Sequence, residues 1–376
     1  MPATPRRYTG GPVAIDLFAG AVGFTTGAEA AGVQVVFAIN HNPRAIANHA
    51  ENHPHTHHRC EDVFRFDFNE AFDLVEEATG HSTPDLILSS PSCVVHSTAR
   101  SRGGGIGKRG GRSENISEDR QRATPEATAH ATLVATKRAQ AERRKPPFLL
   151  VENVEELRLW PFYRTWKLGL EDLGYTSQEY LIEALDFGVA AERERLFVLF
   201  TPTAVSKKPF DLKLPAKRVL GDATRWTEKI KVPKACQLGG HLVRDYGSSP
   251  EWCAPAQLRP AHQIKFQYNL KRAKEMNGGQ APEYWTYMYA TGTKPRFVEH
   301  PQRTITAKAG GQLYVAHSRG GEHASRPVLM EELRGWFGFP DDYLLPPEQS
   351  PAGELIGNAV VPAVAEWIVR QIVEKL

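Results

Sequence analysis

Two apolar runs in the sequence each lead into one reactive side chain. Residues 85–88 run through two serines and Pro91 to Cys93, and residues 148–151 run directly into Glu152. A cysteine nucleophile opposite a glutamic acid suits attack on an electron-poor ring, because one ring atom accepts the thiolate while the acid protonates a ring nitrogen. Taken alone, the pair is equally compatible with a buried free cysteine beside a capping glutamate.

The two runs must be neighbours for that chemistry to occur. Short β-rich runs that alternate with helical segments predict adjacent parallel strands in an α/β sheet. The thiol and the carboxyl would then emerge together at the carboxyl edge of the sheet, where such folds place their chemistry. We expect strands at residues 12–18, 34–39, 85–88, 148–151, 175–182 and 196–200, and helices at residues 43–52, 69–79, 125–144, 162–173 and 363–376.

The length of 376 residues exceeds the usual single core and predicts a second, smaller domain. Regular alternation ends near Thr201, and residues 207–347 carry scattered proline, glycine and aromatic residues with little periodicity. Hydrophobic residues make up 41% of the chain without an apolar run near twenty residues, which predicts a cytoplasmic protein with no membrane contact. Four cysteines at no repeating spacing fit a reducing compartment, so Cys93 is expected to be a free thiol.

A glycine turn follows the first strand, at Asp16 to Gly23. Glycines there let the backbone approach a nucleoside-containing cofactor, and the start of the next helix offers free N–H groups. The alternative is a tight strand-to-helix connection without a ligand. After the second strand, Asn40 and His41 offer amide and imidazole groups that can bind a diol, and Asp62 follows a predicted third strand where a carboxylate can meet an adenine amine.

A glycine-rich basic loop begins soon after Cys93. Its lysines and arginines can neutralise a phosphate backbone with little base selectivity, whereas the alternative is a solvated linker. The net charge of +3 does not by itself demand a nucleic-acid partner, so the position beside Cys93 decides in favour of nucleic acid. The basic residues of the loop are Arg100, Arg102, Lys108, Arg109 and Arg112.

Two groups of residues invite a metal interpretation, and we expect a metal at neither. The first is a histidine cluster whose irregular spacing favours a solvated loop, and the second matches no common zinc finger. The first group comprises His41, His49, His53, His55, His57 and His58, and the second comprises Cys236, His241, Cys253 and His262.

Taken in order, six motifs resemble those of the cytosine-5 DNA methyltransferases that use S-adenosylmethionine, and the resemblance covers nearly the whole chain. It implies a Rossmann-like α/β methyltransferase sheet with a smaller inserted target-recognition domain. The matching segments are the cofactor loop at 16–23, the nucleophile motif at 91–93, the acid motif at 152–154, the paired-arginine motif at 191–195, the end of the recognition region at 303–306 and the closing motif at 357–360.

The resemblance implies a covalent mechanism on a flipped cytosine. Cys93 adds to carbon 6, Glu152 hydrogen-bonds or protonates ring nitrogen 3, and carbon 5 takes the methyl group. Arg195 is expected to contact the base oxygen and Arg193 to brace the nucleophile strand. For this pair the alternative is a surface pair of arginines after a loop. The implied cofactor contacts are Asp16, Phe18, Ala19, Gly20, Gly23, Asn40, His41, Asp62, Pro91 and Asn358, with Phe18 against the adenosyl group and Asn358 at the methionine end.

The resemblance also implies an organisation and a partner. Residues 1–204 would form the catalytic and cofactor-binding domain, residues 205–347 the target-recognition domain, and residues 348–376 a segment that packs back on the first. The expected partner is double-stranded DNA, bound by a monomer. RNA remains an alternative substrate because the motifs do not sense the 2′-hydroxyl, and a catalytically silent DNA-binding relative is a second alternative.

The sequence departs from the family pattern at several motif positions. Around the nucleophile, only Pro91, Cys93 and Ser97 are retained. Val22 replaces a glycine, Ala191 a glutamine and Asn40 an acid. The nucleophile and the acid are retained, so these departures predict a divergent branch of the family that is still active.

Overall fold

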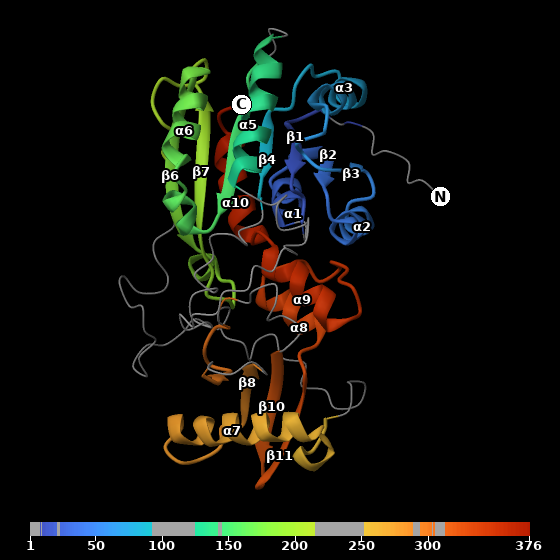
Figure 1. Cartoon of the computed structure of the whole chain (residues 1–376), viewed down its shortest axis with the longest axis vertical. Helices are drawn as coiled ribbons and strands as arrows, with labels where there is room; N and C mark the ends of the chain where they lie inside the picture. The colour runs from blue at the N-terminus through green and yellow to red at the C-terminus, as the bar shows by residue number, and fades with distance from the viewer. Residues whose placement is uncertain are drawn as a thin grey trace, which may run out of the picture. The chain divides into compact units, whose positions relative to one another are not determined.

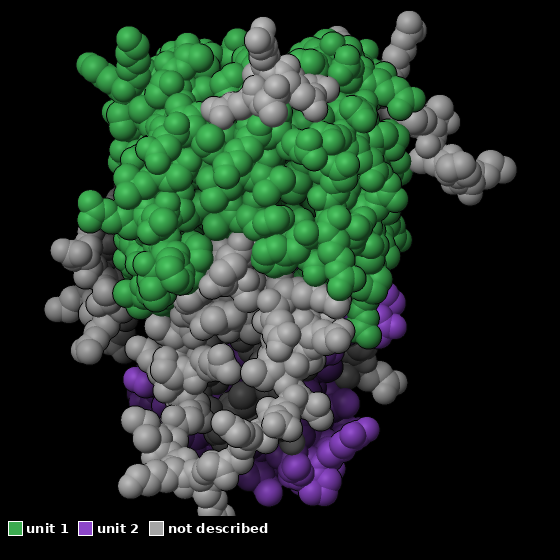
Figure 2. Space-filling model, turned by 45° about the horizontal axis from the view of Figure 1, so that its top comes forward, with its two compact units in different colours: residues 1–182, 194–214, 358–376 green, residues 183–193, 215–357 purple. Residues whose placement is uncertain are grey.

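The computed structural model describes residues 8, 10–20, 23–91, 125–141, 145–214, 252–288, 294–302, 304 and 313–376, with side chains in the helix at 125–141 described from 129 to 139. Figure 1 traces the chain, and Figure 2 colours its two compact units. Unit 1 comprises residues 1–182, 194–214 and 358–376, and unit 2 comprises residues 183–193 and 215–357.

Unit 1 is built on a seven-stranded sheet with the strand order β3-β2-β1-β4-β5-β7-β6 (Figure 1). β1 to β5 all run parallel to one another, and β7, on the other side of β5, runs antiparallel to it. The parallel pairing of β4 with β5 confirms the expected neighbourhood of the two apolar runs. The strands are β1 (Val13–Leu17), β2 (Gln34–Asn40), β3 (His57–Cys60), β4 (Leu86–Ser89), β5 (Phe148–Asn153), β6 (Tyr175–Glu183) and β7 (Glu194–Pro202).

Helices cover both faces of this sheet. Since β-α-β crossovers are right-handed, the helices that follow β1 and β2 lie on the face opposite to those that follow β3 and β4. α3 (Phe68–Thr79), α5 (Pro125–Ala141) and α6 (Tyr163–Asp172) close the larger core, which includes Phe72, Ala135 and Leu170. On the other face α1 (Gly23–Ala30) packs against α10 (Pro362–Val373), and α2 (Pro43–Asn52) lies against β2 and β3.

Local sequence explains where several helices begin and end. Asn42 caps α2, because its side chain accepts a hydrogen bond from the Arg44 N–H while Pro43 occupies the first turn. Asp67 caps α3 in the same way, and α3 ends at Gly80 with a φ of 76°. These boundaries confirm the helices predicted at 43–52 and 69–79.

The histidine-rich segment before β3 differs from the predicted solvated loop. His49 is 0% exposed on α2, and His53 is 6% exposed at the end of that helix. The expectation of a solvated loop is therefore wrong for these two residues. The cause is tertiary: His49 and His53 hydrogen-bond to the hydroxyls of Thr25 and Thr26 on α1, a contact that the local sequence does not reveal.

Unit 2 contains a four-stranded sheet with the order β11-β10-β8-β9. Its described strands pair antiparallel, and α7 (Pro260–Met276) packs Phe266 and Leu270 against Trp285 and Tyr287. The strands are β8 (Tyr284–Met288), β9 (Arg296–Phe297), β10 (Leu313–Arg319) and β11 (Glu322–Pro327), and the following helices are α8 (Met330–Trp336) and α9 (Gln349–Asn358).

The helical stretch Gln349–Val373 is long and apolar enough to cross a membrane by length and composition. Within its most apolar window 72% is buried inside the protein, as in the core helix of a soluble protein. The stretch consists of α9 and α10, with Pro362 in the first turn of α10. Its buried residues on α10 include Val364, Ile368 and Ile372.

Candidate active site

The carboxyl ends of β4 and β5 are tied together by one buried hydrogen bond. Ser89 pairs with Val151 in the parallel register, so Pro91 and Asn153 follow at the same edge. The Asn153 side-chain amide donates to the Pro91 carbonyl at 3.2 Å, and its own carbonyl oxygen accepts the Val154 N–H. Cys93 lies two residues beyond Pro91, outside the described residues.

Glu152 faces Arg195 across the next pair of strands. β7 runs antiparallel to β5 with Glu152 opposite Phe197, so the start of β7 comes to the carboxyl end of β5. The Arg195 Nε lies 3.4 Å from the Glu152 Oε1, and these side chains are 13% and 7% exposed. The Arg195 Nη1 also donates to the Glu194 carbonyl. Glu152 and Arg195 are both predicted to contact the flipped cytosine. The structure brings their side chains together and leaves little of either exposed to solvent.

Arg193 holds the closing motif. Both of its terminal nitrogens donate to the Gly357 carbonyl at 3.2 Å, and its guanidinium lies 5.8 Å from the centre of the Phe337 ring. The side chain is buried, with 3% exposed. These contacts join two motifs 164 residues apart in sequence, and the brace on the nucleophile strand stays a prediction.

The paired-arginine motif also meets the end of the recognition region. Ala191 forms a parallel bridge with Gln302, and the Thr304 hydroxyl donates to the Glu192 carbonyl. The Glu192 side chain forms an ion pair with Arg296 at 2.5 Å. Segments 189–193 and 300–304 therefore form one backbone-paired strap within unit 2.

A pocket lies at the carboxyl ends of β1, β2 and β3. It is a shallow hollow open to solvent, with a cavity volume of about 10 Å³. Four of the predicted cofactor residues line it, and three further residues join them. The predicted ones are Phe18, Asn40, His41 and Asp62, and the others are Ile39, Glu61 and Val63.

The backbone at Phe18 is held in an unusual conformation. Its φ is 65°, in the left-handed region that costs a non-glycine residue of order 1–3 kcal/mol unless its surroundings enforce it. Two hydrogen bonds of the next residue hold this conformation. The Ala19 N–H donates to the Ile39 carbonyl, and the Ala19 carbonyl accepts from the Asn40 side-chain amide. Asn40 is thereby engaged in shaping the turn, and its Oδ1 also accepts the Asn42 N–H.

Asp16 is buried beneath the turn and does not line the pocket. Its side chain accepts a hydrogen bond from the Thr25 hydroxyl at 2.8 Å, and Thr25 in turn contacts His49 Nε2 at 3.0 Å. Burial raises the pKa of Asp16 to about 7, although the hydrogen bonds from Thr25 oppose that rise. The geometry makes Asp16 a support of α1 under the cofactor loop.

Gly23 is required by packing. A Cβ added there would lie 1.7 Å from the Val360 carbonyl oxygen, so only glycine allows α1 to start so close to the closing motif. Asn358 ends α9 two residues before Val360 and is exposed. At Gly20 the nearest atom to an added Cβ is 3.7 Å away, so packing does not demand glycine at that position.

Sequence reasoning missed Glu61 and Asn153. Glu61 stands beside Asp62 after β3, and the Glu61 N–H donates to the Asn40 carbonyl. Asn153 follows Glu152 in the acid motif and provides the tether described above. Each of them is adjacent in sequence to a predicted site residue, and this adjacency is the signal that could have identified them. The basic loop at 100–112 lies outside the described residues.

A doubly wound sheet with a small hollow at one part of its carboxyl edge and an acid–guanidinium pair at another is the arrangement in which α/β enzymes place their sites. The family model for C-5 cytosine-specific DNA methylases matches residues 13–374. The chain therefore belongs to this family and is a DNA cytosine-5 methyltransferase, which confirms the family that the resemblance implied.

Relatives named as type II methyltransferases match over nearly the whole chain. The type II methyltransferase M.SacI of Streptomyces achromogenes is 23% identical over 96% of this chain and 93% of its own length. M.HpaII of Haemophilus parainfluenzae is likewise 23% identical, over 96% and 89%. Among solved structures, a putative DNA modification methyltransferase encoded within an Escherichia coli prophage has a TM-score of 0.59 at 18% identity, covering 96% of this chain and 98% of its own.

Dnmt2 of Schizosaccharomyces pombe has the same fold at a TM-score of 0.59 and 15% identity, again covering 96% and 98%. At such identities the structural likeness concerns the fold alone.

Proposed function

We propose that the chain transfers a methyl group from S-adenosylmethionine to carbon 5 of a flipped cytosine in double-stranded DNA, through a covalent adduct with Cys93. The observation that carries this proposal is the meeting of Glu152 and Arg195 at the edge where β4 leads, through the tethered Pro91, toward Cys93. When bound, S-adenosylmethionine supplies an electrophilic methyl group to carbon 5.

The pocket residues suit the adenosyl part of that donor. Phe18, Ile39 and Val63 offer apolar and aromatic surface to a purine ring, while Glu61 and Asp62 offer carboxylates to amine and hydroxyl groups. The strained turn at Phe18 fits a ligand-contacting segment, because such conformations cluster at binding sites. We assign the pocket to the adenosine moiety and leave the methionine end to the segment near Asn358.

The proposed residues divide the chemistry among themselves. The Cys93 sulfur forms a bond to carbon 6 of the cytosine as Glu152 donates a hydrogen bond or a proton to ring nitrogen 3, which makes carbon 5 nucleophilic. After carbon 5 gains the methyl group, a base removes its proton and the bond between sulfur and carbon 6 breaks. Arg195, held against Glu152, would contact the base oxygen, and its positive charge favours the thiolate form of the nucleophile.

The remaining parts of the proposal concern DNA. We assign target recognition to unit 2, where Lys271 is exposed on α7 beside Tyr268, and backbone contact to the basic residues at 100–112. We further propose that the active species is a monomer in the cytoplasm.

Trapping on a fluorinated duplex tests the covalent proposal. Fluorine at carbon 5 cannot leave as a proton does, so an enzyme that has added its thiolate and received the methyl group stays bound to DNA. The wild-type protein should form a denaturation-resistant adduct with a 5-fluorocytosine duplex and S-adenosylmethionine, and Cys93→Ser should form none. Cys253→Ser is the matched control, because Cys253 is a half-buried free cysteine in unit 2. An adduct with Cys93→Ser would refute the assignment.

A separate measurement tests the pocket. Phe18→Ala and Asp62→Asn should each weaken S-adenosylmethionine binding by at least tenfold in calorimetric titration, since they remove a ring contact and a charge from the same wall. Unchanged binding in both variants would show that the donor lies elsewhere.

A further inference from the structure

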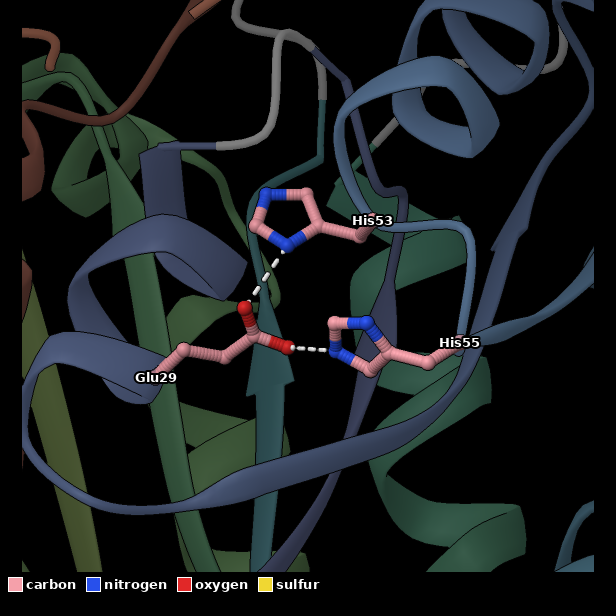
Figure 3. A group of neighbouring side chains, drawn as sticks. All are labelled: Glu29, His53 and His55. Carbon is pink, nitrogen blue, oxygen red and sulfur yellow. Dashed lines mark hydrogen bonds and ion pairs between the residues drawn. The ribbon is translucent and has the colours of Figure 1, made fainter. Parts of the chain in front are cut away.

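A second group of side chains, outside the candidate active site, has the composition of a metal-binding site. Glu29 on α1 faces His53 and His55, which precede β3, and Figure 3 shows both imidazoles turned toward the one carboxylate. His53 Nδ1 lies 2.8 Å from Glu29 Oε2, and His55 Nε2 lies 2.6 Å from Glu29 Oε1. The three potential ligand atoms all lie within 4.8 Å of one another.

The composition of this group suits a late first-row divalent cation. Imidazole nitrogen with one carboxylate is a ligand set that zinc accepts, with a water molecule completing four-coordination. A zinc ion holds such ligands at about 2.0–2.2 Å in a tetrahedral arrangement, so atoms bound to the same ion lie about 3.3–3.6 Å apart. The two imidazole–carboxylate distances are 2.8 and 2.6 Å, and all three ligand atoms lie within 4.8 Å of one another, so rotation of the side chains would be needed to reach that spacing. The cation would replace the protons that now lie between each imidazole and the carboxylate.

The supporting structure holds the two histidines in place. His53 caps α2 through its backbone N–H to the His49 carbonyl, and the Thr56 N–H closes the turn back to the His53 carbonyl. The Thr56 hydroxyl anchors that turn to the Val35 carbonyl on β2. A turn fixed at both ends presents its imidazoles without the ordering cost that a flexible loop would incur.

The second nitrogen of His53 is also engaged. Its Nε2 lies 3.2 Å from the Thr26 hydroxyl, one turn before Glu29 on α1. Metal-binding histidines commonly direct their other ring nitrogen to such a partner, which fixes the ring orientation and the tautomer. The side chains are 8%, 17% and 19% exposed for His53, His55 and Glu29, so the group is largely shielded yet reachable from solvent.

The location indicates a structural role. Glu29 is six residues along α1 from Gly23, about 9 Å at 1.5 Å per residue, and α1 runs away from the carboxyl edge of the sheet. A cation there would bind α1 to the segment between α2 and β3, the elements whose other ends border the cofactor pocket. We propose that Glu29, His53 and His55 form a Zn²⁺ site that stabilises the cofactor-binding half of unit 1.

Zinc titration of the chelator-treated, tag-free full chain tests this proposal. Wild type should bind one Zn²⁺ more tightly than His55→Asn by at least tenfold, and Glu29→Gln should show a comparable loss. His57→Asn is the matched control, because His57 begins β3 in the same segment and does not belong to the cluster. Mg²⁺ should not compete, since it prefers an all-oxygen ligand set.

Thermal unfolding supplies an independent measurement. At one fixed Zn²⁺ concentration the melting temperature of wild type and of His57→Asn should rise, and chelation should reverse the increase, whereas the rise in His55→Asn should be clearly smaller. Equal zinc binding by His55→Asn and His57→Asn, or no stoichiometric binding by wild type, would overturn the proposal and leave two histidine–glutamate ion pairs. Cys93→Ser should retain the same zinc affinity, so this site and the proposed methyl transfer can fail separately.

Discussion

Glu152 in unit 1 and Glu332 in unit 2 both face an arginine and are both nearly buried, but the two pairs are built differently. Glu332 receives two parallel hydrogen bonds from Arg326, at 2.6 and 2.8 Å, and also caps the Leu329 N–H. The Glu152 Oε1 lies farther from its arginine, at 3.4 Å from the Arg195 Nε. A short bidentate pair restricts both partners to one geometry.

The difference separates a structural pair from a pair suited to chemistry. Arg326 and Glu332 are 1% and 0% exposed and connect β11 to α8, with Trp252 stacked on the guanidinium at 4.6 Å. Glu152 stands at a strand end with Arg195 as an orienting neighbour. Comparison of carboxylates across the molecule therefore predicts which substitutions affect stability and which affect turnover.

The largest effect is expected at Glu332. Glu332→Gln leaves the Arg326 charge buried without its carboxylate, which should lower the free energy of unfolding by about 3–5 kcal/mol. Urea unfolding followed by tryptophan fluorescence measures the change. The double variant Arg326→Met/Glu332→Leu removes both charges and should recover most of the loss. A loss below about 1 kcal/mol in the single variant would show that the pair is not the structural element described here.

Glu152→Gln should show the opposite pattern. Glutamine preserves the size of the side chain but cannot donate the proton, so single-turnover methyl transfer should fall at least about a hundredfold. The free energy of unfolding should change much less than in Glu332→Gln, because the 3.4 Å contact with Arg195 is longer than the contacts between Glu332 and Arg326. Rapid-quench transfer of labelled methyl to DNA provides the rate. An unchanged rate would remove Glu152 from the proposed chemistry.

Asp16 extends the comparison to a buried carboxyl that accepts a hydrogen bond from the Thr25 hydroxyl. Its pKa is raised from 3.8 to about 7 in the folded state, so between these pH values the folded state binds a proton that the unfolded state has lost. This contribution to stability is present below about pH 4 and declines as pH rises through 7, at up to about 1.4 kcal/mol per pH unit.

The difference in unfolding free energy between Asp16→Asn and wild type isolates that contribution. Asparagine does not titrate, so the variant should gain on wild type steadily from pH 4 to pH 7. Subtraction is needed because burial and neighbouring histidine charges lower the pKa of His58 to about 4, which makes stability fall with decreasing pH over an overlapping range. A difference that stays constant from pH 4 to 7 would contradict the assigned shift.

The smallest effect is expected at Glu366, which pairs with Arg370 one turn later on α10. These side chains are 34% and 56% exposed. Glu366→Gln should therefore cost only about 0.3–0.5 kcal/mol, and added salt should reduce even that. Thermal unfolding at low and high salt checks both statements. A cost above about 1 kcal/mol would mean that exposure is a poor guide to the value of these pairs.

Much of unit 1 was predictable because its signals are local. The runs that form β4 and β5 are continuously apolar, which is typical of strands buried on both faces of a sheet. Asn42 followed by Pro43 marks the start of a helix. Unit 2 resisted prediction because its core uses Trp285, Tyr287 and the Arg326 ion pair in place of a regular aliphatic period. Its antiparallel sheet is defined by pairing between distant segments.

The sequence by itself determined the alternating fold of unit 1, the order of its motifs and the family. Those properties follow from residue type and spacing along the chain. Only the tertiary structure decided that Arg193 holds the Gly357 carbonyl, that Arg195 orients Glu152, and that His53 and His55 meet at Glu29. Each of these contacts depends on the register and packing of separate elements, which side-chain periodicity within one element does not encode.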